Sequence, residues 1–318
     1  MLYIKSDKIY KNKKVIIMSY FKNIIEKHGI RRKEDQKQSF RKYVQDEFLE
    51  TVNIETLDKK HNNIIIGDIE EAEVVFTAHY DTPATSIIPN VMMPLNKILL
   101  YTYHFGFLIM LAVVCTIIAK AISMLLTNQY IEWIIIYLIL YFSSFIFLMR
   151  FFTNKNNYND NTSGVATILS LAKKNINNKK IAFILFDNEE KGLEGSKAYS
   201  KHHQNMKDKL VINLDCVGNG EHIIVVSKEL AMKNNNYLLL KNSLIDNENY
   251  QVHYYSNKEG SSNSDQKSFD QGIGIMACKK HKLIGYYTAR IHTNKDTVVN
   301  EDNIEYLTEK LTNFINKL

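Results

Sequence analysis

The chain has 318 residues, a formal net charge of +6, 45% hydrophobic residues and 23% charged residues. This composition is typical of a globular protein and excludes a disordered or low-complexity chain. The lysines are scattered and form no basic patch interleaved with aromatic residues, so nothing favours nucleic-acid binding. The three cysteines, Cys115, Cys216 and Cys278, are odd in number and far apart, which excludes a disulfide framework and favours a reducing compartment.

Residues 1–32 are expected to form a segment ahead of the main domain. The apolar run at 15–18 is too short for a secretory signal peptide, and no small-residue cleavage site follows it. Met18, which precedes a predicted helix over 20–28, is an alternative start of the chain. In that case residues 1–17 are an upstream extension.

The next residues predict one helix and three strands. Apolar residues recur at helical spacing over 33–48, and three short β-type runs follow. The predicted strands are 52–57, 63–66 and 74–79, with 59–62 as a hairpin turn between the first two.

Nearly all of the excess apolarity lies between residues 95 and 153. Residues 98–119 contain no Asp, Glu, Lys or Arg, and residues 131–152 contain only Glu132 and Arg150. Each stretch is long enough to cross a bilayer, which takes about 20 apolar residues. We therefore expect a transmembrane helical hairpin. A hydrophobic cap or dimerisation hairpin in a soluble protein is the alternative interpretation.

Two spans return the chain to the side that it left, so residues 33–94 and 154–318 can form one catalytic domain around the insert. The connection between the spans carries a single cation, Lys120, whereas several flank the spans on the other side. Those flanking cations are Lys97, Arg150 and Lys155. By the positive-inside rule we expect a cytoplasmic domain that is anchored to the cell membrane by two spans.

After the insert, predicted helices alternate with short apolar strands. Continuous apolar runs flanked by helices indicate strands that are covered on both faces. The expected fold is therefore an α/β three-layer sandwich with a mixed, mainly parallel central sheet. The expected helices are 163–175, 193–203, 230–244 and 303–318, and the expected strands are 181–186, 210–214, 223–226 and 273–277.

Candidate metal ligands follow the predicted strands, at the carboxyl ends where open α/β sheets place their ligand sites. Two histidines and several carboxylates without a thiolate suit a catalytic zinc pair better than a closed, Cys-rich structural site. Cobalt and manganese bind similar nitrogen and oxygen donors, so the metal itself stays open. The candidates are His79, Asp160, Glu189, Glu190, Asp215 and His292.

Each of these motifs also has a simpler interpretation. His79 and Asp81 are compatible with an ordinary strand end, although Asp81 could also hydrogen-bond the imidazole and fix its tautomer. Asp160 precedes a helix and is compatible with a capping role. The pair Glu189–Glu190 is compatible with a solvated acidic loop. In the functional interpretation, one of the two glutamates binds metal while its neighbour acts as general base and acid.

Taken together, the motifs and their order resemble the co-catalytic di-zinc aminopeptidases. The relatives of that family include bacterial leucyl aminopeptidases, glutamate carboxypeptidase, glutaminyl cyclases and the transferrin-receptor ectodomain. The resemblance covers residues 33–318 apart from the hairpin. Its motifs are HYD (79–81), NDNTSG (159–164), EEKGLEGS (189–196), a strand-end aspartate at 215 and HTNKDT (292–297).

The resemblance implies two zinc ions per chain and a role for each residue of the site. The implied zinc ligands are His79 and Asp215 for one ion, Glu190 and His292 for the other, and Asp160 as the bridge. Glu189 would be the general base, and Asp81 would orient the imidazole. The implied reaction is removal of N-terminal residues from peptides by a water that the two zinc ions activate.

One motif departs from the family pattern. Where relatives often have Ser-Asp-His, this chain has Gln266 in place of the histidine. Ser261 or Ser262 also falls near the position where some relatives supply a tyrosine hydroxyl to the oxyanion. The group that polarises the substrate carbonyl is therefore left open.

Two other functions fit the same resemblance. A glutaminyl-cyclase-like aminoacyltransferase would need one working zinc and a closed pocket, and a membrane receptor or scaffold would keep the fold without activity. The complete ligand set favours the peptidase. Because the hairpin lies between the motifs of His79 and Asp160, we expect the active-site rim near the bilayer. The substrate would then be a peptide that arrives at or leaves the membrane. The oligomeric state is not predicted.

Overall fold

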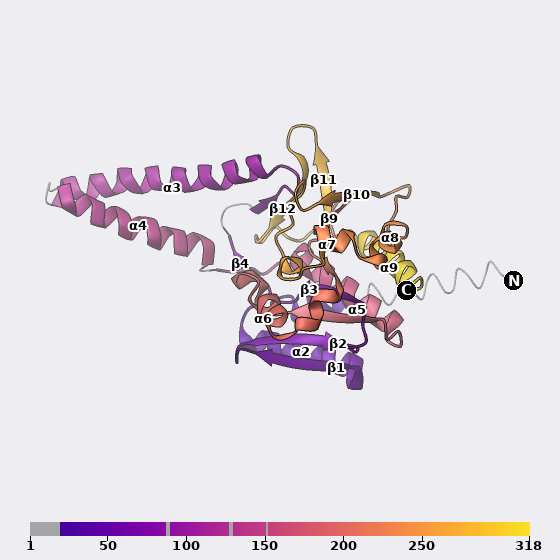
Figure 1. The fold of residues 1–318 in the computed structure, drawn as a ribbon. Helices are drawn as coiled ribbons and strands as arrows, with labels where there is room; N and C mark the ends of the chain where they lie inside the picture. The colour runs from indigo at the N-terminus through magenta and orange to yellow at the C-terminus, as the bar shows by residue number, and fades with distance from the viewer. Residues whose placement is uncertain (1–19, 87–89, 127–129, 151) are drawn as a thin grey trace.

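The computed structural model describes residues 20–86, 90–126, 130–150 and 152–318 (Figure 1). The alternative start at Met18 lies outside these residues. A helix over 20–28 opens the described chain, as predicted, and α2 (Glu34–Phe48) follows it. The side chains of Tyr20 and Ile24 are buried in the main core, so this first helix is part of the domain.

A ten-stranded mixed sheet forms the centre of the molecule. Its strands are β1 (Val52–Leu57), β2 (His61–Ile66), β3 (Val74–His79), β5 (Asn90–Met92), β7 (Ile181–Phe186), β8 (Leu210–Leu214), β9 (His222–Ser227), β10 (Gln251–Ser256), β11 (Gly272–His281) and β12 (Gly285–Ile291). The order is β1-β2-β7-β3-β8-β11, after which one branch continues through β9 to β10 and the other through β12 to β5. The central strands β7, β3, β8 and β11 are parallel.

Helices cover both faces of this sheet, which confirms the three-layer α/β sandwich. Alternate residues of a strand point to opposite faces. In β3, Val74 and Phe76 belong to the core that contains residues of α5 (Gly164–Asn175) and α9 (Glu301–Ile315). Val75 belongs to the core on the other face, together with Tyr199 of α6 (Glu194–His202).

Several element boundaries differ from the sequence expectation. The single helix expected over 230–244 is two short helices, α7 (Glu229–Met232) and α8 (Asn235–Lys241). The break occurs because Asn234 adopts an extended conformation and its side chain accepts a hydrogen bond from the backbone of Asn236, which starts a new helix. The first hairpin turn is also shorter than expected, since β2 already begins at His61.

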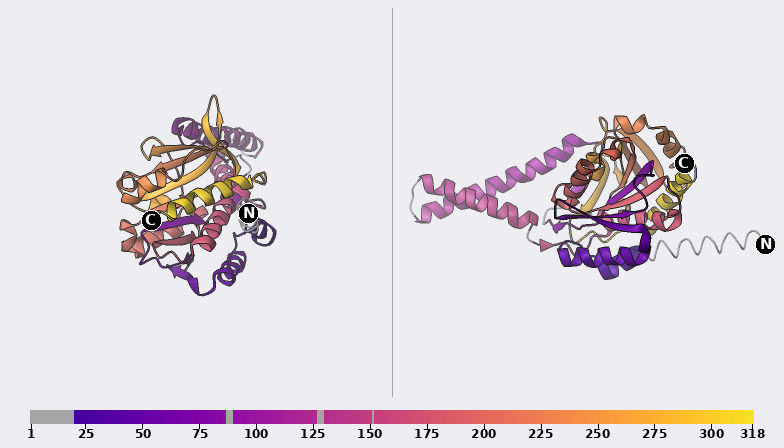
Figure 2. Two further views of the ribbon diagram at one scale, coloured as in Figure 1. Left: turned by 90° about the vertical axis from the view of Figure 1, so that its right-hand side faces the viewer. Right: turned by 60° about the horizontal axis from the view of Figure 1, so that its bottom comes forward.

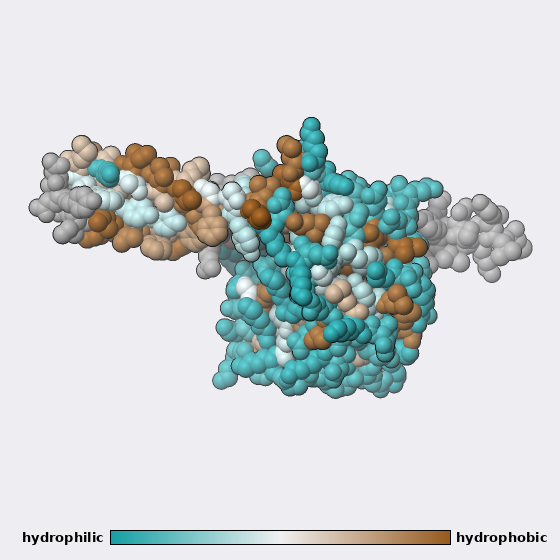
Figure 3. Space-filling model, turned by 45° about the horizontal axis from the view of Figure 1, so that its top comes forward, coloured by the Kyte–Doolittle hydropathy of each residue, from teal (hydrophilic) through white to brown (hydrophobic). Residues whose placement is uncertain are grey.

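The apolar insert forms a helical hairpin that projects from one side of the sandwich (Figure 2). Its helices are α3 (Lys97–Leu126) and α4 (Tyr130–Arg150). At its base, β4 (Ala84–Thr85) pairs with β6 (Phe152–Thr153) in a small antiparallel sheet. Figure 3 shows brown and pale side chains along this arm, against a mostly teal body.

Among the described residues, one helical segment, Lys97–Leu125, is long and apolar enough to cross a membrane. Only 17% of its most apolar stretch is buried inside the molecule, so it is not a core helix. The apolar part of α4, Trp133–Leu148, is shorter. Of the two expected spans, α3 is therefore confirmed as long and apolar enough to cross a membrane, whereas the apolar part of α4 is too short to meet the same criterion.

Candidate metal centre

The candidate ligands lie at one edge of the sheet because their strands are parallel neighbours. His79 is the last residue of β3, Asp215 directly follows β8, and Glu189 and Glu190 follow β7 after two residues. The carboxyl ends of neighbouring parallel strands meet, and this edge is where open α/β sheets bind ligands. His292 directly follows β12 and reaches the same place.

Asp160 lies between the two histidines. Its Oδ1 is 3.3 Å from Nε2 of His79, and its Oδ2 is 2.9 Å from Nε2 of His292. Asp215 Oδ1 lies 3.8 Å from the same nitrogen of His79, and Glu190 Oε2 lies 3.4 Å from that of His292. The structure thus brings together all five predicted ligands as two groups that share Asp160, and each group could hold a metal ion.

The donor atoms of this cluster fit cations. His79, Asp160 and Asp215 are buried, and Asp215 Oδ1 and Glu190 Oε1 are buried without a hydrogen-bond partner. Buried polar atoms are rarely left unpaired, because the loss of water costs free energy that a partner must offset. Imidazole nitrogens and carboxylate oxygens are donors for divalent metals, zinc among them.

The pKa values of the cluster reflect burial and crowded carboxylates. Burial raises the pKa of Glu190 to about 8, with His292 opposing the shift and Asp160 adding to it. Burial lowers the pKa of His292, but Glu190 and Asp160 outweigh it and bring this pKa to about 9. Burial also opposes ionisation of Asp160, yet the two histidines hold its pKa well below the usual range.

Asp81 holds the turn that carries the two glutamates. Its carboxylate accepts the backbone N–H of Glu189 at 3.0 Å and that of Glu190 at 3.2 Å. The predicted hydrogen bond from the imidazole of His79 to this carboxylate is not formed, because Asp81 Oδ1 lies 3.7 Å from Nδ1. The backbone carbonyl of Asp81 lies 3.2 Å from that nitrogen instead. Asp81 therefore orients the imidazole through its backbone and the glutamate turn through its side chain.

Glu189 lies beside the cluster, close to His79 and Glu190. Glu189, His79 and Glu190 form a third group whose ligand atoms lie within 4.8 Å of one another. Burial raises the pKa of Glu189 well above its ordinary value, with His79 opposing the shift and Glu190 adding to it. Asn188, just before it, has φ 57°, a left-handed conformation that turns the chain sharply after β7.

Comparison with protein-family models supplies the deciding observation: residues 152–312 match peptidase family M28. The chain belongs to this family. The match covers Asp160, Glu189, Glu190, Asp215 and His292, whereas His79 lies before the hairpin and outside it. A comparison with curated protein sequences gives no significant match.

Solved structures of similar fold include three bacterial proteins. The Legionella pneumophila LapA aminopeptidase has a TM-score of 0.56 at 16% identity, with 96% of this chain and 69% of that chain covered. A Porphyromonas gingivalis glutaminyl cyclase has a TM-score of 0.59 at 14% identity, with 96% of this chain and 98% of that chain covered. A Zn-dependent exopeptidase from Parabacteroides distasonis has a TM-score of 0.58 at 13% identity, with 95% of this chain and 97% of that chain covered. These likenesses confirm the zinc-exopeptidase-like fold and, with the family match, the resemblance seen in the sequence.

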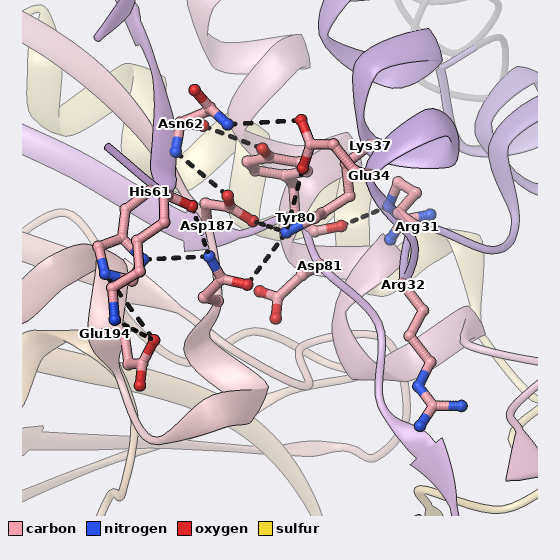
Figure 4. A network of polar contacts seen from close by, with 12 residues as sticks. Arg31, Arg32, Glu34, Lys37, His61, Asn62, Tyr80, Asp81, Asp187 and Glu194 are labelled. Atoms are coloured by element: carbon pink, nitrogen blue, oxygen red, sulfur yellow. Dashed lines mark hydrogen bonds and ion pairs between the residues drawn. The ribbon is translucent and has the colours of Figure 1, made fainter. Parts of the chain in front are cut away.

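In this M28 chain, a buried polar network supports the glutamate turn from behind (Figure 4). The ammonium of Lys37 in α2 donates to Asp187 Oδ1 at 2.6 Å and to Asn188 Oδ1 at 3.0 Å. The other oxygen of Asp187 accepts the backbone N–H of Asn62 at 3.1 Å. Asp187 and Asn188 directly precede Glu189, so Lys37 fixes the path of the chain into the site.

Arg31 joins the two loops that carry His79 and Asp160. It is fully buried, and its guanidinium donates to the carbonyl of Tyr80 and to Thr162 Oγ1. Burial lowers the pKa of Arg31 to about 10, with Asp81 and other acidic groups opposing the shift. Sequence reasoning missed both Arg31 and Lys37, because a cation among surface-type residues gives no signal that it is buried.

Two further residues position Asp160. The carboxylate of Asp296 accepts the backbone N–H groups of Asn159 and Asp160, both at 3.0 Å. Asn161 Oδ1 accepts the N–H of Gly164 at 3.2 Å. Asn161 therefore caps the helix start, and the capping role considered for Asp160 does not occur. Asp296 belongs to the quoted HTNKDT motif, so the sequence contained a signal for it.

Gln266, which replaces the histidine of the family pattern, is buried beneath the site rather than open to it. Gln266 accepts a hydrogen bond from Asn213 at 3.0 Å and donates to Ser262 Oγ at 2.8 Å. The cleft instead receives Ser261 and Asn263. Burial raises the pKa of the neighbouring Asp265 to about 7, with His79 opposing the shift.

A cleft of about 370 Å³ opens over the cluster. This volume is at the lower end of the range for ligand pockets, about 300–1,000 Å³, and suits the end of a peptide rather than a long segment. Besides the cluster residues, its lining includes residues 90–94, which pair with β12 or directly precede the hairpin, and Leu100 and His104 of α3.

Proposed function

We propose that this M28 chain is a membrane-anchored zinc aminopeptidase that hydrolyses the N-terminal residue from peptides. The observation that carries the proposal is the position of Asp160. Each of its two carboxylate oxygens faces a different histidine, and each histidine has a second carboxylate beside it. One shared carboxylate between two pairs of donors is the arrangement that a co-catalytic metal pair requires.

In this proposal the chain binds two zinc ions. His79 and Asp215 hold one ion, Glu190 and His292 hold the other, and Asp160 is shared. Zinc is favoured because neutral nitrogen and carboxylate donors without thiolates form its catalytic sites. When bound, such ions act as Lewis acids that polarise a carbonyl and lower the pKa of water.

The residues of the chain then supply orientation and proton transfer. Glu189 lines the cleft beside the cluster, and its carboxylate takes the proton of the attacking water and delivers it to the leaving amine. Asp81 keeps this carboxylate in place through the backbone N–H groups of the turn. The buried Lys37 supports the same turn, so Glu189 is preorganised for its role.

The residues of the cleft favour the amino end of a peptide over its carboxyl end. A substrate carboxylate is usually held by Arg or Lys, which supply charge-assisted hydrogen bonds. Neither residue type is present among the described residues that line this cleft. Carboxylates and metal ions there instead suit an α-amine, which can hydrogen-bond to the former or coordinate the latter.

Membrane anchoring is supported by the exposed apolar surface of the arm. Side chains along α3 such as Phe105, Ile109 and Ile117 are more than half exposed, which is costly in water and favourable in lipid. The 21 residues of α4 extend about 31 Å at about 1.5 Å per residue, so the whole helix matches the hydrocarbon thickness. We propose two spans, with the domain on the cytoplasmic side that Lys97 and Lys155 indicate.

The test is hydrolysis of a panel of aminoacyl reporter substrates by the full chain in detergent, with metal counting on the same samples. We expect about two zinc ions per chain, and activity that falls at least about a hundredfold in Glu189→Gln while the metal content stays the same. Two bound metals without hydrolysis of any reporter would contradict the aminopeptidase.

A glutaminyl cyclase remains the second candidate, because one of the similar solved structures is such an enzyme. The same samples are therefore incubated with peptides that begin with glutamine. Loss of ammonia with the peptide bond intact would identify cyclisation, whereas release of free glutamine would identify the peptidase. Absence of bound metal together with absence of both reactions would indicate a binding protein.

A further inference from the structure

Residues 90–94 and the first turns of α3 form a wall of the cleft over the candidate metal centre. Met92, Met93 and Pro94, just before the hairpin, line it, together with Leu100 and His104 of α3. Leu100 and His104 of this wall belong to the insert, residues 90–94 directly precede it, and all of them lie outside the residues that match the family model, which begin at 152. The segment that leads to the membrane therefore also shapes the site.

Hydrogen bonds join this wall to both sides of the cleft. β5 pairs with β12, the strand that ends next to His292 (Figure 1). The N–H of Ser86, before the wall, donates to the carbonyl of His292 at 2.7 Å. The N–H of Ser261, which also lines the cleft, donates to the carbonyl of Pro94 at 2.7 Å. The wall is thus held in a fixed position relative to the cluster.

The first turns of α3 extend the wall and at the same time face outward. Leu100 and His104 line the cleft, whereas Tyr101 and Phe105, one position further on, are each 60% exposed. Residues four apart share one helix face, and successive residues differ by about 100°. One stripe of α3 therefore faces the cleft and the adjacent stripe faces the surroundings of the arm.

We propose that this wall receives the side chain of the substrate's N-terminal residue and makes the enzyme selective for large apolar residues there. Val91, Met92, Met93 and Leu100 contribute apolar side chains to the same cleft as the candidate ligands, and no Lys or Arg occurs among the described lining residues. Methionines adapt to side chains of different shape because they are unbranched and flexible. The inference depends on the proposed aminopeptidase activity. It adds a pocket for the substrate side chain next to the carboxylates that would bind the α-amine.

The position of the wall explains why selectivity would be apolar rather than charged. An α-amine bound at the carboxylates would leave the adjoining side chain within the same small cleft, whose lining includes this wall. A cationic side chain there would lose its water without gaining an ion pair from these wall residues. One methylene more or less in such a pocket changes kcat/KM by about 10- to 200-fold, so the wall can set the preference.

The test compares Leu100 variants of the full chain on reporters that differ only in the N-terminal residue. We expect Leu100→Gln to lower the ratio of kcat/KM for Leu over Ala by about tenfold, because a polar group replaces apolar surface. We expect Leu100→Ala to raise the ratio for Trp over Leu, because the wall recedes. A gain for the larger residue is an outcome that simple loss of stability does not produce.

Ile98→Gln is the matched control. Ile98 lies in the same first turn of α3, is 82% exposed and does not line the cleft, so its substitution removes the same kind of apolar surface without touching the wall. Active enzyme whose side-chain preference is the same in all variants would overturn the inference while leaving the aminopeptidase in place. Absence of hydrolysis in the unmodified chain would instead count against the proposed function.

Discussion

Neighbouring residues at this site divide the work of structure and chemistry. In the NDNTSG segment, Asn161 caps the helix and Asp296 binds the backbone, so the carboxylate of Asp160 is free for the two histidines. In the glutamate turn, Asp187 and Asn188 are bound by Lys37, so Glu189 and its neighbour project into the cleft. The neighbouring residues make the structural hydrogen bonds, so the carboxylates of Asp160, Glu189 and Glu190 remain available to the cleft.

This division predicts the effect of removing Lys37. Its side chain is 4% exposed and pairs with Asp187, which is 0% exposed, so Lys37→Met leaves a buried carboxylate without its cation. Breaking a buried pair costs about 3–5 kcal/mol. We expect the free energy of unfolding to fall by that amount in denaturant titrations. Adding Asp187→Asn should restore part of it, and a double variant less stable than the single one would contradict the explanation.

At the level of elements, the sequence predicted what hydrophobic periodicity encodes. β1, β3, β7 and β8 have the predicted bounds. β3, β7 and β8 are buried along their whole length and appear as largely apolar runs bounded by polar residues, whereas β1 is mostly half-buried or exposed. β12 was not predicted, although it carries the chain to His292. Its sequence, GYYTARI, is only partly buried and does not alternate cleanly, so no periodic signal marks it.

Site residues follow the same rule. His79 and Asp215 could be placed together from sequence, because the ends of parallel strands coincide in space. The partner Arg31 lies between the first helix and α2, and Lys37 lies in α2, and their contacts depend on tertiary packing that no local pattern encodes.

At Gly195, the backbone of α6 lies very close to the end of β7, and this close approach leaves no room for a side chain. A Cβ on Gly195 would stand 2.0 Å from the carbonyl oxygen of Asp187 and 2.8 Å from Asn63 Oδ1, so Gly195→Ala must push the helix away. We expect a loss of about 1–3 kcal/mol in the free energy of unfolding and lower activity, since Asp187 leads into the glutamate turn.

Gly106→Ala is the control for that substitution. Nothing lies within 4 Å of a Cβ at Gly106, which is also helical, so the added methyl group should be neutral or slightly stabilising. Equal losses of stability in the two variants would show that the close approach of α6 to β7 is not the cause.

At the scale of the whole molecule, the arm combines two roles that its length separates. At the base of the arm, Leu100 and His104 line the cleft. The outer part exposes apolar side chains, and none of its described residues lines the cleft. The pairing of β4 with β6 closes the base independently of the outer helices. We therefore expect a shortened arm to lose the proposed bilayer contact and to keep the wall of the cleft.

We predict that replacing residues 113–143 with a short Gly/Ser turn converts the chain from a membrane-bound to a water-soluble enzyme. The variant keeps the first turns of α3 and the end of α4, so soluble aminoacyl reporters should be hydrolysed with an unchanged order of side-chain preference. In vesicles, the full chain should cleave a peptide anchored by a C-terminal lipid faster than the same peptide without lipid, because enzyme and substrate are confined to one surface. The shortened variant should lack this advantage. Sedimentation with vesicles measures the first effect and paired rates measure the second; a shortened chain that still sediments with lipid would show that the arm is not the anchor.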